Sequence, residues 1–152
     1  MNIFYVNRDP QKAATELVDK HVVKMPLETA QLLCSVFEQG VAPYRRTHYN
    51  HPSAIWTRKS KANYEWLINH GLALCEEYTH RYKKNHKSEA VIRWCKERIN
   101  DISWLDTSFS DPPACMPEDC KLNDVVLSYQ EYYRKHKSYI YSWTNRQKPD
   151  WA

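Results

Sequence analysis

Glycine is scarce in this chain, with 2 residues among 152. Because glycine supplies the left-handed backbone that tight turns need, its scarcity argues against a β-sandwich with many hairpins. The length is that of one domain and is enough to bury a core without disulfides or metal. We therefore predict a mainly α-helical, single compact domain over residues 1–152, with one or two long helices and a short extended segment at the N-terminus.

Long apolar runs are also missing. No stretch of about 18 apolar residues occurs, and no signal-peptide pattern precedes Asn7. The five cysteines are an odd number, and Cys34 and Cys75 fall within helical apolar patterns, as buried free thiols do. These features predict a protein without a membrane partner in a reducing, cytoplasmic setting.

Cys115 and Cys120 have the spacing C-x4-C, which is half of a zinc-site pattern. No second cysteine or histidine pair has the matching zinc-finger spacing. The sequence therefore predicts no structural metal, and no cofactor is expected.

Aromatic and basic residues are abundant instead, with 11 Tyr, 6 Trp and a formal net charge of +4. Residues 44–61 contain arginine, lysine and histidine but no acid, whereas acids gather between Asp101 and Asp124. A basic side on a two-signed molecule fits a phosphate-bearing partner. DNA or a nucleotide is the expected partner, and a solvated charged face is the plain alternative.

Capping residues and apolar periodicity mark the helices. Asp9-Pro10 is a typical helix start, and Pro26 is expected either to kink one long helix or to open a second one. Further helices are expected over residues 27–38 (closed by Gly40), about 53–82, 89–99 (capped by Ser88) and about 124–135 (capped by Asn123 or Asp124), with mostly loop over 100–120.

The first candidate site is formed by His21, Lys24 and Glu28. If the helix runs through Pro26, their i, i+3, i+7 spacing places them on one face. A base, an amine and a carboxylate are a usable acid–base set, and a lysine in an apolar pocket can act as a nucleophile. The plain alternative is a solvent-facing Glu–Lys pair.

The second candidate site follows from the basic stretch. His51-Pro52-Ser53 begins a helix, whose free N–H groups suit an anion, and two arginines precede it. Metal ligation by His48 and His51, or capping alone, are alternatives. The aromatic and basic tail, about 138–152, either stacks on bases or packs over the core. The candidate nucleic-acid- and phosphate-binding residues are Arg45, Arg46, His48, His51, Ser53, Arg58, Lys61, Asn63, Trp143 and Arg146.

The segment from His21 to Glu28 resembles the N-terminal helix of the phage-type pyrimidine-dimer DNA glycosylase/AP lyases, in which a histidine precedes the catalytic glutamate by seven residues. The later layout is similar too: a basic loop leads to His51-Pro52-Ser53, a long aromatic helix and an aromatic, basic tail. The resemblance implies an all-α protein that flips a base out of the duplex. It also implies an N-terminal α-amine that attacks the sugar C1′ to form a Schiff base, with Glu28 assisting proton transfer.

The chain departs from the family pattern at its start. Asn2 stands where the family has a threonine that is exposed after the initiator Met is removed, and the apolar Ile3-Phe4-Tyr5 follows. Leu27 and Gln31 stand near the places of the family's arginines. The amine of Met1 and the side chain of Lys24 are therefore both candidate nucleophiles.

The function expected from these patterns is base processing of the glycosylase/AP lyase type, with Glu28 as general acid–base and His21 as an orienting group. Two other functions fit the same residues. One is a phage accessory or inhibitor protein that binds nucleotide, nucleic acid or a host protein without turnover. The other is a metal-dependent phosphodiesterase or nuclease using His48 and His51. Nothing in the patterns fixes an oligomeric state.

Overall fold

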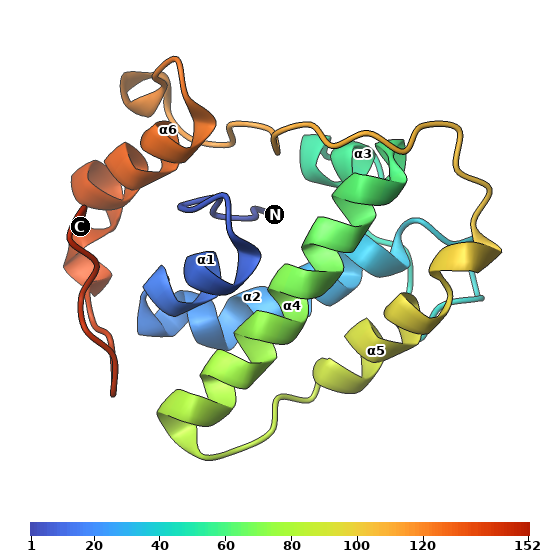
Figure 1. The fold of residues 1–152 in the computed structure, drawn as a ribbon, viewed down its shortest axis with the longest axis horizontal. Coiled ribbons are helices and arrows are strands. Elements are labelled where there is room, and N and C mark those ends of the chain that lie inside the picture. The colour runs from blue at the N-terminus through green and yellow to red at the C-terminus, as the bar shows by residue number, and fades with distance from the viewer.

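A computed structural model describes residues 1–152 and contains six α-helices and no strand. The helices are α1 (Pro10–Glu16), α2 (Asp19–Cys34), α3 (Pro52–Lys59), α4 (Lys61–Tyr82), α5 (Glu89–Glu97) and α6 (Val125–Tyr132). Helix α4 crosses the molecule, α5 lies alongside it, and the chain start lies between α4 and α6 (Figure 1). The predicted helical class is confirmed. None of the helices combines the length and apolar character that a membrane span requires.

The start of α1 is as predicted, because the side chain of Asp9 accepts hydrogen bonds from the first free backbone N–H groups and Pro10 follows. Helix α2 runs without interruption through Pro26. Proline removes one helical hydrogen bond, and burial of Pro26 with its neighbours Val22 and Ala30 offsets that loss. The continuous helix places Lys24 and Glu28 one turn apart.

Several features of the expected helices were wrong. The long helix expected from Ser53 breaks at Ser60, whose extended backbone (φ −147°, ψ 155°) lets its side chain cap α4 through Asn63. Helix α2 ends at Cys34, before Gly40, which lies in the following loop with φ +85°. Ser88 precedes α5 but makes no side-chain cap, since its hydroxyl is 3.1 Å from the hydroxyl of Tyr44.

The core lies where α2, α4 and α5 meet. A Cβ atom at Gly71 on α4 would come within 2.8 Å of Thr29 on α2 and 3.0 Å of Ile92 on α5. Glycine is therefore needed there for close helix packing rather than for a turn. This packing holds α2 rigidly, with Glu28 at the edge of the core.

The loop after α5 contains short 3-10 turns at Ile99–Asp101 and Glu118–Cys120, and it crosses the molecule to reach α6 (Figure 1). Asp124 caps α6 as expected, by accepting from the N–H of Leu127. A π-helical turn, Tyr133–Lys137, continues α6 and leads into a last 3-10 turn, Ser138–Ile140.

The C-terminal tail packs over the helices. The indole of Trp143 donates to the carbonyl of Glu16, and Arg146 pairs with Glu77 on α4 at 2.6 Å. Of the two expected roles of the tail, the structure shows the wrap over the core.

Candidate active site

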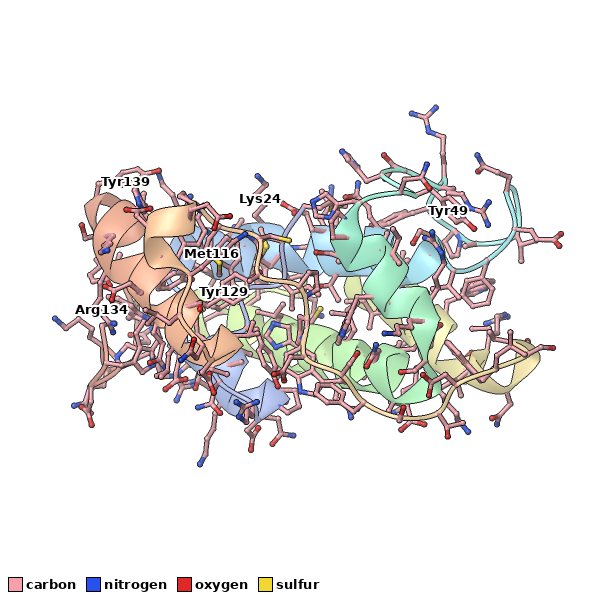
Figure 2. All side chains as sticks on the ribbon, turned by 90° about the horizontal axis from the view of Figure 1, so that it is seen from above. Lys24, Tyr49, Met116, Tyr129, Arg134 and Tyr139 are labelled. Atoms are coloured by element: carbon pink, nitrogen blue, oxygen red, sulfur yellow. The ribbon has the colours of Figure 1, made fainter.

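Glu28 lies between nitrogen atoms from two parts of the chain. Its side chain is 11% exposed, and its Oε1 accepts from the backbone N–H of Asn2 at 3.2 Å and lies 3.7 Å from the amine of Met1. Its Oε2 lies 3.5 Å from the Nζ of Lys24, one turn earlier on α2. The side chain of Lys24 is 69% exposed, and Figure 2 shows it pointing outward from α2. A mostly buried carboxylate thus has two primary amines beside it.

Asn2 fixes the chain start. Its side-chain oxygen accepts from the N–H of Ile3 at 2.8 Å and from the hydroxyl of Tyr129 at 2.7 Å, and its amide donates to the carbonyl of Cys115 at 2.9 Å. Phe4 then takes a left-handed backbone conformation (φ 55°) and is buried. A non-glycine residue in this region is unusual and needs support from its surroundings. The first residues are therefore packed down, which holds the Met1 amine at Glu28.

His21 does not join this group, although it shares a face of α2 with Glu28. Its ring stacks on Phe4 with 4.0 Å between centroids, and its Nδ1 lies 2.5 Å from the hydroxyl of Tyr133. Burial lowers the pKa of His21 to about 3, with Lys137 and Lys24 acting in the same direction. A neutral, enclosed imidazole is suited to supporting Phe4 and the chain start rather than to exchanging protons with substrate.

Two buried histidines predict an acid-sensitive fold. Burial lowers the pKa of His70 to about 4, although its hydrogen bond to the carbonyl of Pro10 opposes this. Both pKa values in the folded protein lie below the ordinary histidine value of 6.5. Between the lowered and the ordinary pKa, the unfolded chain therefore binds more protons than the folded protein does. Stability is complete above about pH 6.5 and falls as the pH drops through this window. From pH 7 to pH 5, we expect a loss of roughly 2 kcal/mol for each histidine.

Urea unfolding of the wild type and His70→Asn at both pH values checks this expectation. Asparagine retains a donor for the Pro10 carbonyl but does not titrate, so the pH-dependent loss should fall by about half. An equal loss in both proteins would exclude this role of His70.

The basic loop, which comprises residues 44–51 before α3, is built around Tyr49. The guanidinium groups of Arg46 and Arg58 lie over its ring, 4.2 and 3.8 Å from the centroid. Arg46 also donates to the carbonyl of Phe37, and Arg58 donates to the carbonyl of Tyr49. The side chain of Arg45 is exposed and makes no hydrogen bond to the rest of the protein. Tyr49 is labelled in Figure 2 and shows where this loop lies. Around it the guanidinium groups of Arg46 and Arg58 are held in place, whereas that of Arg45 is not.

His51 lies where the basic loop meets α3, within electrostatic range of Glu28. It precedes Pro52 at the start of α3, and its Nδ1 accepts from the N–H of Ser53 at 3.0 Å. Burial lowers the pKa of His51, as do the charges of the chain start and His48, while Glu28 opposes this. Ser53 is buried, and its hydroxyl lies 3.8 Å from the thiol of Cys115. His48 contacts Thr47, and no third ligand joins the two histidines in a cluster that could hold a metal ion.

Four other expected binding residues have contacts elsewhere. Asn63 is buried and forms hydrogen bonds with the backbone of Trp56 and Ser110. Lys61 is the first residue of α4, and its backbone N–H donates to the carbonyl of Asp106. Trp143 and Arg146 belong to the C-terminal wrap described above. The structure thus brings the amines of Met1 and Lys24 to Glu28, and it places His51 near enough to the chain start and Glu28 to interact with their charges. It does not bring Lys61, Asn63, Trp143 or Arg146 to them.

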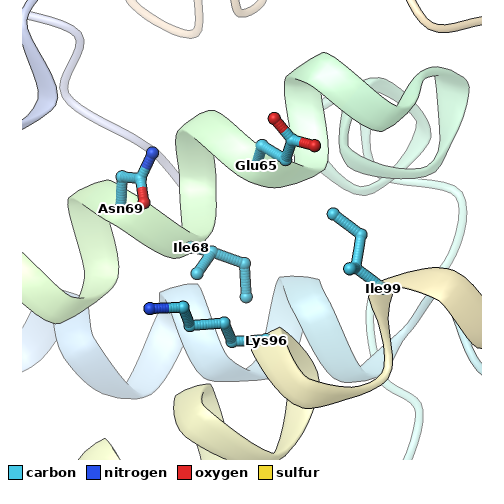
Figure 3. A pocket seen from close by; sticks show the side chains of 5 residues that line it. All are labelled: Glu65, Ile68, Asn69, Lys96 and Ile99. Atoms are coloured by element: carbon cyan, nitrogen blue, oxygen red, sulfur yellow. The ribbon is translucent and has the colours of Figure 1, made fainter.

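Asn2, Cys115 and Tyr129 were missed as contributors to the site. Tyr129 lies 127 positions from Asn2, so no local pattern links them. The one available signal was the departure from the family's threonine at position 2. A hollow between α4 and α5, lined by Glu65, Ile68, Asn69, Lys96 and Ile99, contains none of the site residues (Figure 3).

Fold and site together define an all-helical protein whose mostly buried carboxylate faces two amines, beside a basic, aromatic loop. Residues 1–90 match the family model described as pyrimidine dimer DNA glycosylase. The match covers 90 of 152 residues, including Lys24, Glu28 and His51, and the chain belongs to this family. Comparisons with curated proteins and with solved structures gave no match. Membership supports a function of the DNA glycosylase type, in DNA repair, with DNA as substrate.

Proposed function

We propose that the protein is a DNA glycosylase with AP lyase activity, in which the amine of Met1 is the nucleophile and Glu28 carries the proton. The observation that supports this best is the position of Glu28, 3.7 Å from the Met1 amine and 3.2 Å from the N–H of Asn2. A carboxylate within reach of an amine can accept the proton that the amine loses on attack.

The geometry favours the α-amine over Lys24. The chain start is held by Asn2, whereas the side chain of Lys24 is 69% exposed.

The proposed reaction begins with a nucleotide flipped out of the duplex. The unprotonated amine attacks C1′ of the sugar, the bond from C1′ to the base breaks, and the base leaves with the electron pair. Glu28 takes the proton lost by the amine and returns it to the sugar ring oxygen as the ring opens to the Schiff base. The pyrimidine dimer named for the family is the first substrate to test.

The basic loop is proposed to bind the DNA backbone. Arg45 is exposed, and Arg46 and Arg58 are held over Tyr49, so their charges need little reordering on binding. The N-terminus of α3, with His51 and Ser53, is proposed to hold one phosphate near the reacting sugar. The five cysteines form no disulfide, which supports action in the reducing cytoplasm.

Borohydride trapping on duplexes with a pyrimidine dimer or an abasic site tests this proposal. The wild type should form a covalent adduct on both DNAs. Adding Gly-Ser before Met1 turns the α-amine into an amide, and the adduct should fall by more than about 100-fold. Lys24→Ala is the matched control and should retain the adduct, because the α-amine is untouched. Peptide mapping locates the attached residue.

The other outcomes would replace the proposal. An adduct lost only in Lys24→Ala would make Lys24 the nucleophile. The absence of any adduct on either DNA would reject Schiff-base chemistry. In that case, tight DNA binding without turnover would favour a binding protein.

A further inference from the structure

A second cluster of reactive side chains lies away from Glu28, in the part of the chain beyond the matched residues 1–90. It consists of Asp119 and Cys120, in the 3-10 turn Glu118–Cys120, and His136, in the π-helical turn after α6. One ligand atom from each residue lies within 4.8 Å of the other two. We propose that Asp119, Cys120 and His136 bind a zinc ion that fastens this turn to the end of α6.

The distances fit a tetrahedral ion. Zinc bonds of about 2.0–2.3 Å at tetrahedral angles place neighbouring ligand atoms about 3.3–3.8 Å apart. The Oδ1 of Asp119 lies 3.2 Å from the Nε2 of His136 and 3.7 Å from the Sγ of Cys120. Small side-chain rotations suffice to place these atoms around one ion, and water takes the fourth position.

The ligand types indicate the metal. A thiolate with an imidazole suits zinc, whereas magnesium and calcium prefer oxygen ligands. A surface pair of Asp119 and His136 alone contributes little to stability and does not require a thiol. Cys120 is nevertheless buried with its Sγ directed toward Asp119, while the side chains of Asp119 and His136 are 54% and 40% exposed. The site therefore has a fixed inner ligand and an open outer side through which an ion can enter.

The nearby positive charges leave the ligand atoms accessible. Lys135 donates to the backbone carbonyl of Asp119 at 2.8 Å, and Lys121 pairs with Glu118 at 2.7 Å. Neither lysine occupies the carboxylate of Asp119. Cys115, which has the C-x4-C spacing to Cys120, contacts Ser53 instead. Spacing in the sequence therefore suggested a different partner for Cys120 from the one that the fold provides.

The ion would strengthen a weakly supported part of the fold. The loop between α5 and α6 has only two short 3-10 turns, and the backbone of Cys115 within it holds Asn2. Zinc at Cys120 would join this loop to the π-helical turn after α6, where His136 lies 16 positions further on. A π-helical turn at His136 agrees with this role, because such turns occur frequently at functional sites.

The test uses the full-length protein, stripped with a chelator and then titrated with Zn²⁺ or Co²⁺. We expect one equivalent to bind at micromolar concentration or tighter, a thiolate-to-cobalt charge-transfer band, and a rise in Tm with zinc. Cys120→Ser and His136→Ala should each weaken binding by more than about 100-fold, since even changes outside the ligand shell cost 10- to 100-fold. Cys115→Ser and His80→Ala are the matched controls and should bind as the wild type does.

Absence of stoichiometric binding would overturn the proposal, and so would binding that survives both ligand substitutions. His136 is exposed, so His136→Ala is expected to fold and decides the outcome if Cys120→Ser does not. The readouts are independent of DNA, which separates this proposal from the glycosylase function.

Discussion

Replacing Glu28 with glutamine is expected to lower the rates of adduct formation and strand cleavage by about 100- to 10,000-fold, the usual contribution of a general acid–base. Glutamine has nearly the same shape, and its amide oxygen can still accept from the N–H of Asn2, as the carboxylate does at 3.2 Å. It cannot accept a proton from the Met1 amine. DNA affinity should change little, because the residues proposed to bind phosphate lie on the basic loop and α3. Single-turnover rates and DNA affinity, measured on the same DNA, separate the two effects.

Leu27→Gln is the matched control for this substitution. Leu27 precedes Glu28 on α2 but is 41% exposed, and it contacts none of the amines. The control variant should retain wild-type rates. Equal rates for the wild type and Glu28→Gln would remove the carboxylate from the mechanism, whereas a matching loss of DNA affinity would make Glu28 a binding residue.

The helices were predictable wherever a local signal fixes them. Asp9-Pro10 and Asp124 cap their helices through contacts two or three residues away, so the pattern contains the whole interaction. The break at Ser60 was missed because apolar spacing continues across it, although Ser60 caps α4 through a contact only three residues away. Continuation of α2 through Pro26 depends on burial, which local propensity does not report.

The candidate site, too, was predictable only where a local pattern determines the contact. Lys24 and Glu28 are one helical turn apart, and their contact follows from the helix alone. The amine of Met1 reaches Glu28 only because Asn2 is bound to Tyr129, and His21 is kept away because Phe4 and Tyr133 enclose it. These contacts join residues that are far apart in the chain, so spacing could not assign His21 its surroundings.

Replacing Arg81 with methionine is expected to cost about 3–5 kcal/mol of unfolding free energy, the largest effect on stability that we predict. The guanidinium is fully buried and donates to Glu77 at 2.7 Å, to Asp19 at 2.9 Å and to the carbonyl of Thr15 at 3.0 Å. It therefore joins α1, α2 and α4 at one point. Methionine fills similar space but leaves two carboxylates without their shared cation in a poorly solvated place. The urea midpoint at pH 7 measures the loss.

Arg146→Met provides the comparison, since Arg146 binds the same Glu77 from the surface with its side chain 34% exposed. Its loss leaves Arg81 to neutralise Glu77, so a cost below about 1 kcal/mol is expected. Burial raises the pKa of Glu77, but the hydrogen bonds from Arg146 and Arg81 outweigh this and hold it below its ordinary value. A lowered carboxylate pKa contributes stability above the unfolded value that disappears as the pH falls. The difference between Arg81→Met and the wild type should therefore shrink in acid, and a difference independent of pH would assign the loss to packing instead.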